Sequence, residues 1–74
     1  MQLKYPINLI GAYDLEFGDV ATQDGEIVGT WTLIDGALYE FTPLGGDQPI
    51  LIDPFIWSLC KSIGEWLEAR ESAQ

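Results

Sequence analysis

The sequence predicts a two-layer α+β fold, in which a four-stranded antiparallel meander sheet carries one C-terminal amphipathic helix packed on one face. Two patterns predict it. Apolar residues alternate with polar ones through most of residues 3–41, and from residue 56 onward they recur at helical spacing instead. A run of strands followed by a helix within 74 residues is typical of a single α+β domain, so we expect one domain spanning residues 1–74.

We expect strands near residues 2–10, 12–18, 26–34 and 37–42. Side chains alternate between the two faces of a strand, so apolar residues at odd positions would share one face. Pro6 lacks an N–H, which favours an edge position or an interruption for the first strand. The odd set consists of Leu3, Tyr5, Ile7, Leu9, Tyr13, Leu15, Phe17, Ile27, Trp31, Leu33, Ala37, Tyr39 and Phe41.

The turn around Asp35-Gly36 admits two registers for the last two strands. A two-residue loop would put Trp31 opposite Glu40, whereas a three-residue loop closing on Gly36 would put Trp31 opposite Tyr39. We favour the second register because it keeps the odd apolar residues on one face, and a slip by one residue would turn half of them to water.

A change of period marks the helix. Asp53-Pro54 predicts its start, because Asp is a preferred N-cap and Pro suits the first helical position. A loop at residues 45–49 and a short apolar piece at residues 50–52 precede it, and the helix should end near Arg70 or Glu71. One apolar stripe follows the cap: Ile56, Leu59, Cys60, Ile63, Trp66 and Leu67.

The inventory of reactive residues argues against catalysis. The chain has no His and one Cys, so a serine or thiol nucleophile would lack its usual base, and no His-Cys cluster exists for a metal. Cys60 falls on the apolar stripe, where a small buried hydrophobe is expected. Asp14 and Glu16 would share a strand face, but a domain this small offers little room for a cleft around them. We therefore expect no enzyme activity, no cofactor and no metal.

Charge and hydropathy bound the partners and the location. The net charge of −9 argues against direct binding to nucleic acid or anionic lipid, since both are polyanions. The N-terminus does not resemble a signal peptide, and no apolar run approaches the roughly 18 residues of a membrane span. A cytoplasmic protein is the expectation.

The acidic residues allow two interpretations. They either form a solubilising coat or provide a surface for a basic partner. In the second case Asp14, Glu16, Glu26 and Glu40 would project from a rigid sheet at spacings close to those of nucleic-acid phosphates, and could occupy a nucleic-acid-binding groove.

The even positions predict a second surface. If the odd residues pack on the helix, the even face becomes an exposed apolar patch of the kind found at interfaces. Trp57 lies off the helix stripe and is a candidate aromatic anchor. The outward-facing set would be Ile10, Val28, Ile34 and Leu38, beside Thr30 and Thr32.

These features favour a small, acidic, non-catalytic protein-interaction module that inhibits or modulates a protein with a basic surface, for example a nucleic-acid-binding protein. The composition is similar to that of small acidic inhibitors encoded by phages and mobile elements. The alternative is a homodimeric structural or regulatory module whose even face is self-complementary. The predicted partner-binding residues are Asp14, Glu16, Glu26, Val28, Ile34, Leu38, Glu40 and Trp57.

Overall fold

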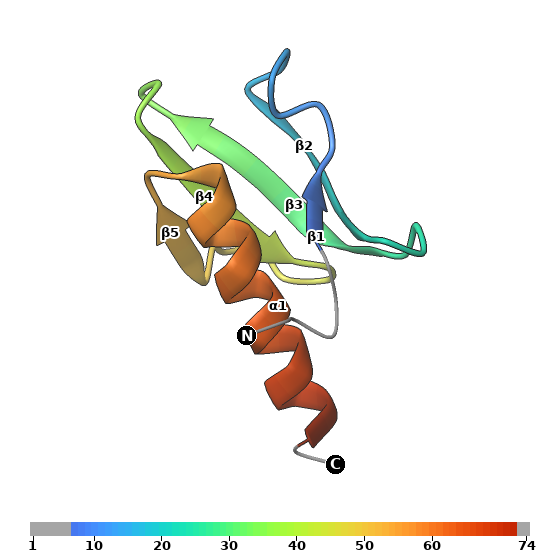
Figure 1. The fold of residues 1–74 in the computed structure, drawn as a ribbon. Helices are drawn as coiled ribbons and strands as arrows, with labels where there is room; N and C mark the ends of the chain where they lie inside the picture. Colours follow the sequence, from blue (N-terminus) through green and yellow to red (C-terminus); the bar gives the residue numbers. More distant parts are fainter. Residues whose placement is uncertain (1–6, 73–74) are drawn as a thin grey trace.

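A computed structural model describes residues 7–72 and shows an antiparallel sheet followed by one helix (Figure 1). The sheet has five strands in the order β1-β2-β3-β4-β5, so each strand pairs with its neighbour in the sequence. The elements are β1 (Ile7–Leu9), β2 (Phe17–Thr22), β3 (Ile27–Ile34), β4 (Leu38–Pro43), β5 (Leu51–Asp53) and α1 (Ile56–Ser72). The α+β class is confirmed, but the prediction of four strands is wrong, because the short apolar piece near residues 50–52 pairs with β4 as a fifth strand.

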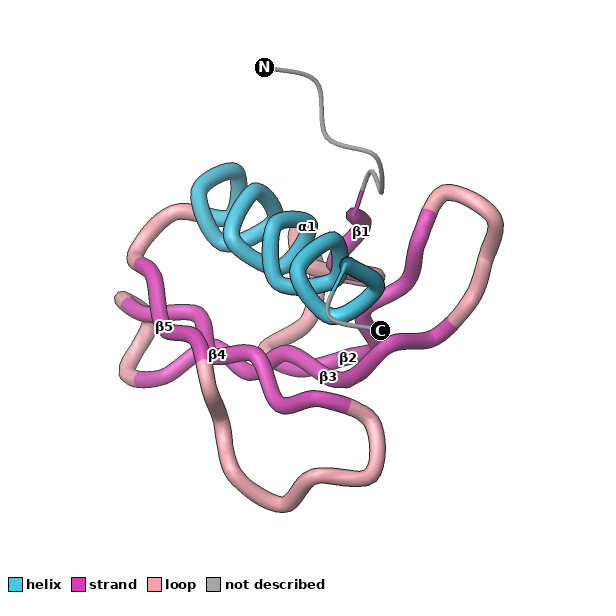
Figure 2. The backbone as a smooth tube through the Cα atoms, turned by 90° about the horizontal axis from the view of Figure 1, so that it is seen from below, coloured by secondary structure: helices cyan, strands magenta, loops and turns pink. Residues whose placement is uncertain are grey.

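The sheet is curled, and α1 lies against one side of it (Figure 2). The helix contacts β1 and β5, the two edge strands, as well as β4. We call the side of the sheet that faces α1 the inner face and the opposite side the outer face. In the described part of the chain, no helix covers the outer face (Figure 2).

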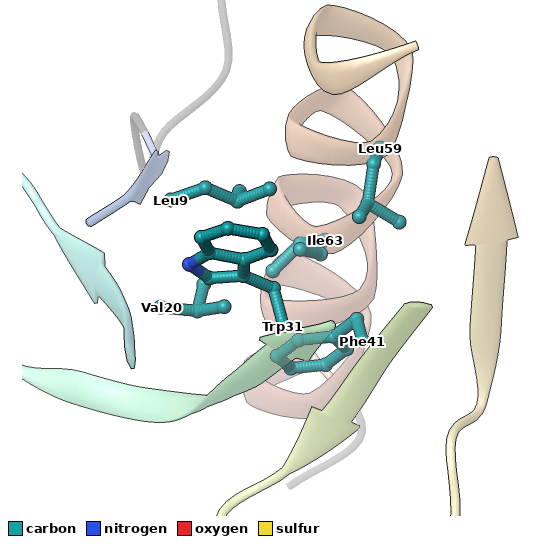
Figure 3. Packing of buried hydrophobic residues seen from close by; sticks show 6 residues of the cluster. All are labelled: Leu9, Val20, Trp31, Phe41, Leu59 and Ile63. Carbon is teal, nitrogen blue, oxygen red and sulfur yellow. The ribbon is translucent and has the colours of Figure 1, made fainter. Parts of the chain in front are cut away.

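The core lies between the inner face and α1. Trp31 and Phe41 are completely buried, which confirms the predicted inward orientation of these two odd positions. Leu59 and Ile63 of the helix stripe are also fully buried against the sheet (Figure 3). The core cluster consists of Leu9, Val20, Trp31, Phe41, Leu59 and Ile63.

Trp31 occupies the centre of this core through a specific arrangement with β2. Its partner across the sheet is Gly18, and the absence of a side chain there leaves room for the indole. A Cβ at Gly18 would overlap the carbonyl oxygen of Ile10 and lie 2.9 Å from Trp31 Nε1. The indole N–H reaches past this glycine and donates to the Ile10 carbonyl at 3.0 Å, which satisfies a polar group that would otherwise be buried unpaired.

The β3–β4 hairpin keeps the predicted face but not the predicted register. Trp31 pairs with Phe41, so both registers considered from the sequence are wrong, the favoured one by two residues. Asp35 (φ 55°) and Gly36 (φ 67°) have the two positive φ angles of a type I′ turn, which suits the twist of a hairpin. Ala37 donates to the Ile34 carbonyl at 3.0 Å and remains outside the strands, so one extra residue joins the loop.

The predicted strand at residues 12–18 is wrong. Residues 11–14 form a turn, in which Gly11 has a φ of +80°, and β2 begins only at Phe17. Tyr13, Leu15 and Phe17 are 92%, 55% and 69% exposed, so none of them is a core residue. Of the predicted strand at 2–10, only Ile7–Leu9 is observed as β1, and Leu3, Tyr5 and Pro6 lie outside the described residues.

The helix begins slightly later than predicted. Asp53 is the last residue of β5, and its carboxylate accepts a hydrogen bond from the Phe55 N–H at 2.9 Å. The first backbone bond of the helical type runs from the Leu59 N–H to the Phe55 carbonyl. Asp53-Pro54 therefore forms the bend between strand and helix rather than the first helical turn, because residues 51–53 are held in the sheet by their pairing with β4.

Candidate interaction surface

The outer face of the sheet is the side that no helix of residues 7–72 covers. Residues that pair directly across strands lie on the same face, so the register defines its rows. The central row runs through Phe17, Thr32, Glu40 and Ile52, one residue from each of β2, β3, β4 and β5. A neighbouring row contains Asp19, Thr30 and Thr42, and on the other side Ile34 pairs with Leu38.

Large apolar side chains stand at both ends of the central row. Phe17 is 69% exposed and Ile52 is 56% exposed, while Leu38 beside them is 40% exposed. Several exposed apolar side chains on one face are typical of interaction sites, whereas single exposed apolar residues are normal. The outer face is therefore the best candidate for an interaction surface in residues 7–72.

Sequence reasoning missed Phe17 and Ile52. In β3 and β4 the outer positions are even, but the β2–β3 pairing joins odd to even residues, so Phe17 of β2 faces outward with Thr32. The glycine at position 18 was the available signal, because a bulky inward Trp31 needs a small partner across the sheet. Ile52 was missed because three residues are too few to show an alternation.

Glu40 occupies the middle of the outer face. Its neighbours across the sheet are Thr32 and Ile52, and the residues two positions away along β4 are Leu38 and Thr42. The side chain is half-buried, and within residues 7–72 its carboxylate has neither a hydrogen bond nor an ion pair. Of the four acids predicted to bind a partner, Glu40 is the one that lies inside a strand.

The other three predicted acids do not join it on the sheet. Asp14 belongs to the turn at residues 11–14, Glu16 precedes β2, and Glu26 precedes β3 at the end of the β2–β3 turn. All three are exposed. The predicted row of carboxylates at phosphate-like spacing on a rigid sheet is therefore wrong. It required Asp14, Glu16 and Glu26 to lie within strands, and all three lie in turns or loops instead.

Of the three aliphatic residues predicted to bind a partner, two lie on the outer face and one does not. Ile34 and Leu38 pair with each other on the outer face, as expected. Val28 does not, because it is half-buried and packs against the core cluster. The register shifts between Val20 and Ala21, where Val20 pairs with Gly29 but Ala21 pairs with Ile27, and this irregularity gives β3 one extra residue at Val28.

Trp57 lies apart from the outer face, in the first turn of α1. It is 75% exposed, and the Lys61 ammonium lies 5.9 Å from its ring, within the range of a cation–π contact. Phe55, just before the helix, is 69% exposed. Both aromatic side chains are exposed at the start of the helix, and Trp57 is confirmed to lie off the buried stripe.

Both basic residues in the described range belong to the helix. Lys61 faces Trp57, and the Arg70 guanidinium lies 4.7 Å from the Trp66 ring. Since α1 covers the inner face, neither cation neutralises Glu40 or Asp19 on the outer face. The outer face thus combines apolar side chains with acids and carries no Lys or Arg from residues 7–72.

Cys60, the single cysteine of the chain, lies half-buried on α1. Burial raises the pKa of the Cys60 thiol, which opposes formation of the reactive thiolate. Among residues 7–72, no three His, Cys, Asp or Glu side chains gather closely enough to hold a metal ion. The single described helix lacks the length and apolar content needed to cross a membrane.

Comparison of the chain with protein-family models, with curated proteins and with solved structures found no match.

Proposed function

We propose that this chain is a small, acidic, non-catalytic interaction module that binds a protein with a basic surface and thereby inhibits or modulates it. The observation that carries the proposal is the outer face, which no described helix covers, and where Leu38 and Ile52 lie next to Glu40 and Phe17 lies in the same row beyond Thr32. Binding to a nucleic-acid-binding protein would fit the charge, because such targets present basic surfaces.

The charge of the whole chain supports the same reading. A net charge of −9 on a chain of this size attracts basic proteins over a distance set by the ionic strength. Such long-range attraction raises the rate of association more than it raises the final affinity. The apolar residues of the outer face would then supply the short-range contact that holds the complex together.

The test is capture of host proteins on the immobilised chain at low and at high salt, followed by mass spectrometry. The control resin carries an unrelated folded protein with the same net charge, which removes partners retained by charge alone. We expect at least one protein that is retained by the chain and absent from the control. High salt should either release this protein from the chain or slow its binding. Retention of the same proteins on both resins would contradict the proposal.

A homodimer is the alternative, and the outer face is where it would form. The apolar residues of this face suit a self-complementary contact. Two outer faces would, however, bring Glu40 and Asp19 against a surface that holds the same acids and no described cation. This charge distribution favours a different protein over a second copy, and light scattering at micromolar concentration distinguishes the two.

A further inference from the structure

The outer face places a half-buried carboxylate, that of Glu40, next to the apolar side chains of Leu38 and Ile52, and this arrangement restricts the proteins that can cover it. Glu40 is half-buried before any partner binds, and it has no hydrogen-bond or ion-pair partner among residues 7–72. A protein docked over Phe17 and Ile52 would also cover Glu40, because all three belong to the same row of the sheet.

Covering a carboxylate has a known cost. An ionised side chain that loses water without gaining a partner destabilises a complex strongly, whereas one that meets a cation and hydrogen-bond donors does not. The neighbours of Glu40 cannot supply the cation, because Thr32, Thr42 and Ile52 are uncharged and both described basic residues lie on α1. The partner must therefore bring it.

We propose that the outer face docks a protein surface that presents a lysine or arginine within an apolar patch, and that Glu40 accepts this cation. The proposal rests on the proposed function in that it takes the partner to be a protein. The aromatic ring of Phe17 and the side chains of Leu38 and Ile52 contact the apolar surroundings of the cation, and Glu40 fixes its position. Specificity then follows from the position of one charge, and affinity from the apolar contacts around it.

A library selection tests this proposal without knowledge of the natural partner. Random peptides displayed on phage are selected on the immobilised chain, and the best binder is synthesised for titration. We expect enriched peptides to carry a lysine or arginine beside aliphatic or aromatic residues. Glu40→Gln and Phe17→Ser should each weaken the peptide by at least about tenfold, as expected for a covered charge pair and for an apolar anchor.

Two matched controls separate the outer face from general charge and general stickiness. Glu65→Gln removes one exposed acid from α1, and Tyr13→Ser removes an exposed aromatic ring from the turn at residues 11–14. Both should leave affinity within about twofold. An isolated surface charge such as Glu65 contributes little, and Tyr13 lies in a turn and not in a strand of the outer face. Circular dichroism melting of every variant verifies that it is folded as the parent is.

Charge reversal provides the sharpest outcome. Glu40→Lys should abolish binding of the selected peptide, and a peptide in which its basic residue is replaced by Glu should recover binding to Glu40→Lys. The proposal is overturned by selection of peptides without a cation, by an absence of enriched peptides, or by equal loss with Glu40→Gln and Glu65→Gln. The chain could also form a dimer without peptide, and Phe17→Ser could dissociate that dimer. This result would assign the outer face to a second copy and would overturn the proposal as well.

These outcomes are independent of the lysate experiment. Failure to capture any host protein contradicts the proposed function while the selection result stands. Peptides that bind elsewhere contradict the docking surface while a captured host protein would still support the proposed function.

Discussion

The two faces of one sheet differ in what their side chains contact. On the inner face Trp31 and Phe41 are fully buried beneath α1, while on the outer face Phe17 and Ile52 remain more than half exposed. The same strands supply both sets, so β-strand propensity does not explain the difference. The comparison indicates that stability resides on the inner face, and that the apolar residues of the outer face are free to serve another purpose.

The largest effect should come from removing the central inner residue. Trp31→Ala deletes a completely buried side chain and its hydrogen bond to the Ile10 carbonyl, and should destabilise the fold by about 3–5 kcal/mol. Denaturant unfolding followed by circular dichroism measures this. A loss below about 1 kcal/mol would show that the inner face is not the main source of stability.

Gly18→Ala tests the close approach beneath the indole. The new methyl group would overlap the Ile10 carbonyl and press on the Trp31 ring, so we expect a loss of about 1–3 kcal/mol. Asp19→Ala is the matched control, because the neighbouring residue points to the outer face and is exposed. Equal effects of the two substitutions would contradict the described packing.

The bend between β5 and α1 should contribute less. Asp53→Ala removes the acceptor for the Phe55 N–H in the bend before α1, and we expect a loss of about 0.5–1.5 kcal/mol, the usual net contribution of one hydrogen bond. Asp47→Ala changes an exposed acid in the β4–β5 loop and provides the control for the loss of one charge. The two unfolding midpoints, compared under the same conditions, decide the point.

The smallest effect is expected on the outer face. Phe17→Ser should change the free energy of unfolding by no more than about 0.5 kcal/mol, because the ring is 69% exposed. Thermal melting of this variant beside Trp31→Ala measures the contrast between the two faces directly. A strong destabilisation by Phe17→Ser would mean that this ring supports the fold, and the outer face would lose its main candidate for partner binding.

Sequence patterns predicted those parts of the fold that have enough residues to show a period. The buried stripe of α1 from Leu59 to Ile63 and the inward orientation of Trp31 and Phe41 followed from such periods. The alternation of Tyr13, Leu15 and Phe17 was misleading, because a turn at Gly11 with positive φ cannot be distinguished from a strand by hydropathy alone.

The candidate site was predicted only in part for the same reason. Ile34, Leu38 and Glu40 lie on the outer face as expected, but Phe17 and Ile52 depend on pairings between strands. The β2–β3 register, with its irregularity near Val20, decides which side of the sheet each residue of β2 occupies. No local pattern carries that information, because register is a property of two strands together.

The packing of α1 against β1 has a consequence for synthesis. Leu9 belongs to the first strand of the described chain and Ile63 to its last element, yet both are members of the same buried cluster. A chain is synthesised from its N-terminus, so all five described strands are made before the helix that covers Trp31. The core can therefore be completed only after α1 has been made, and until then the apolar residues of the inner face have no cover.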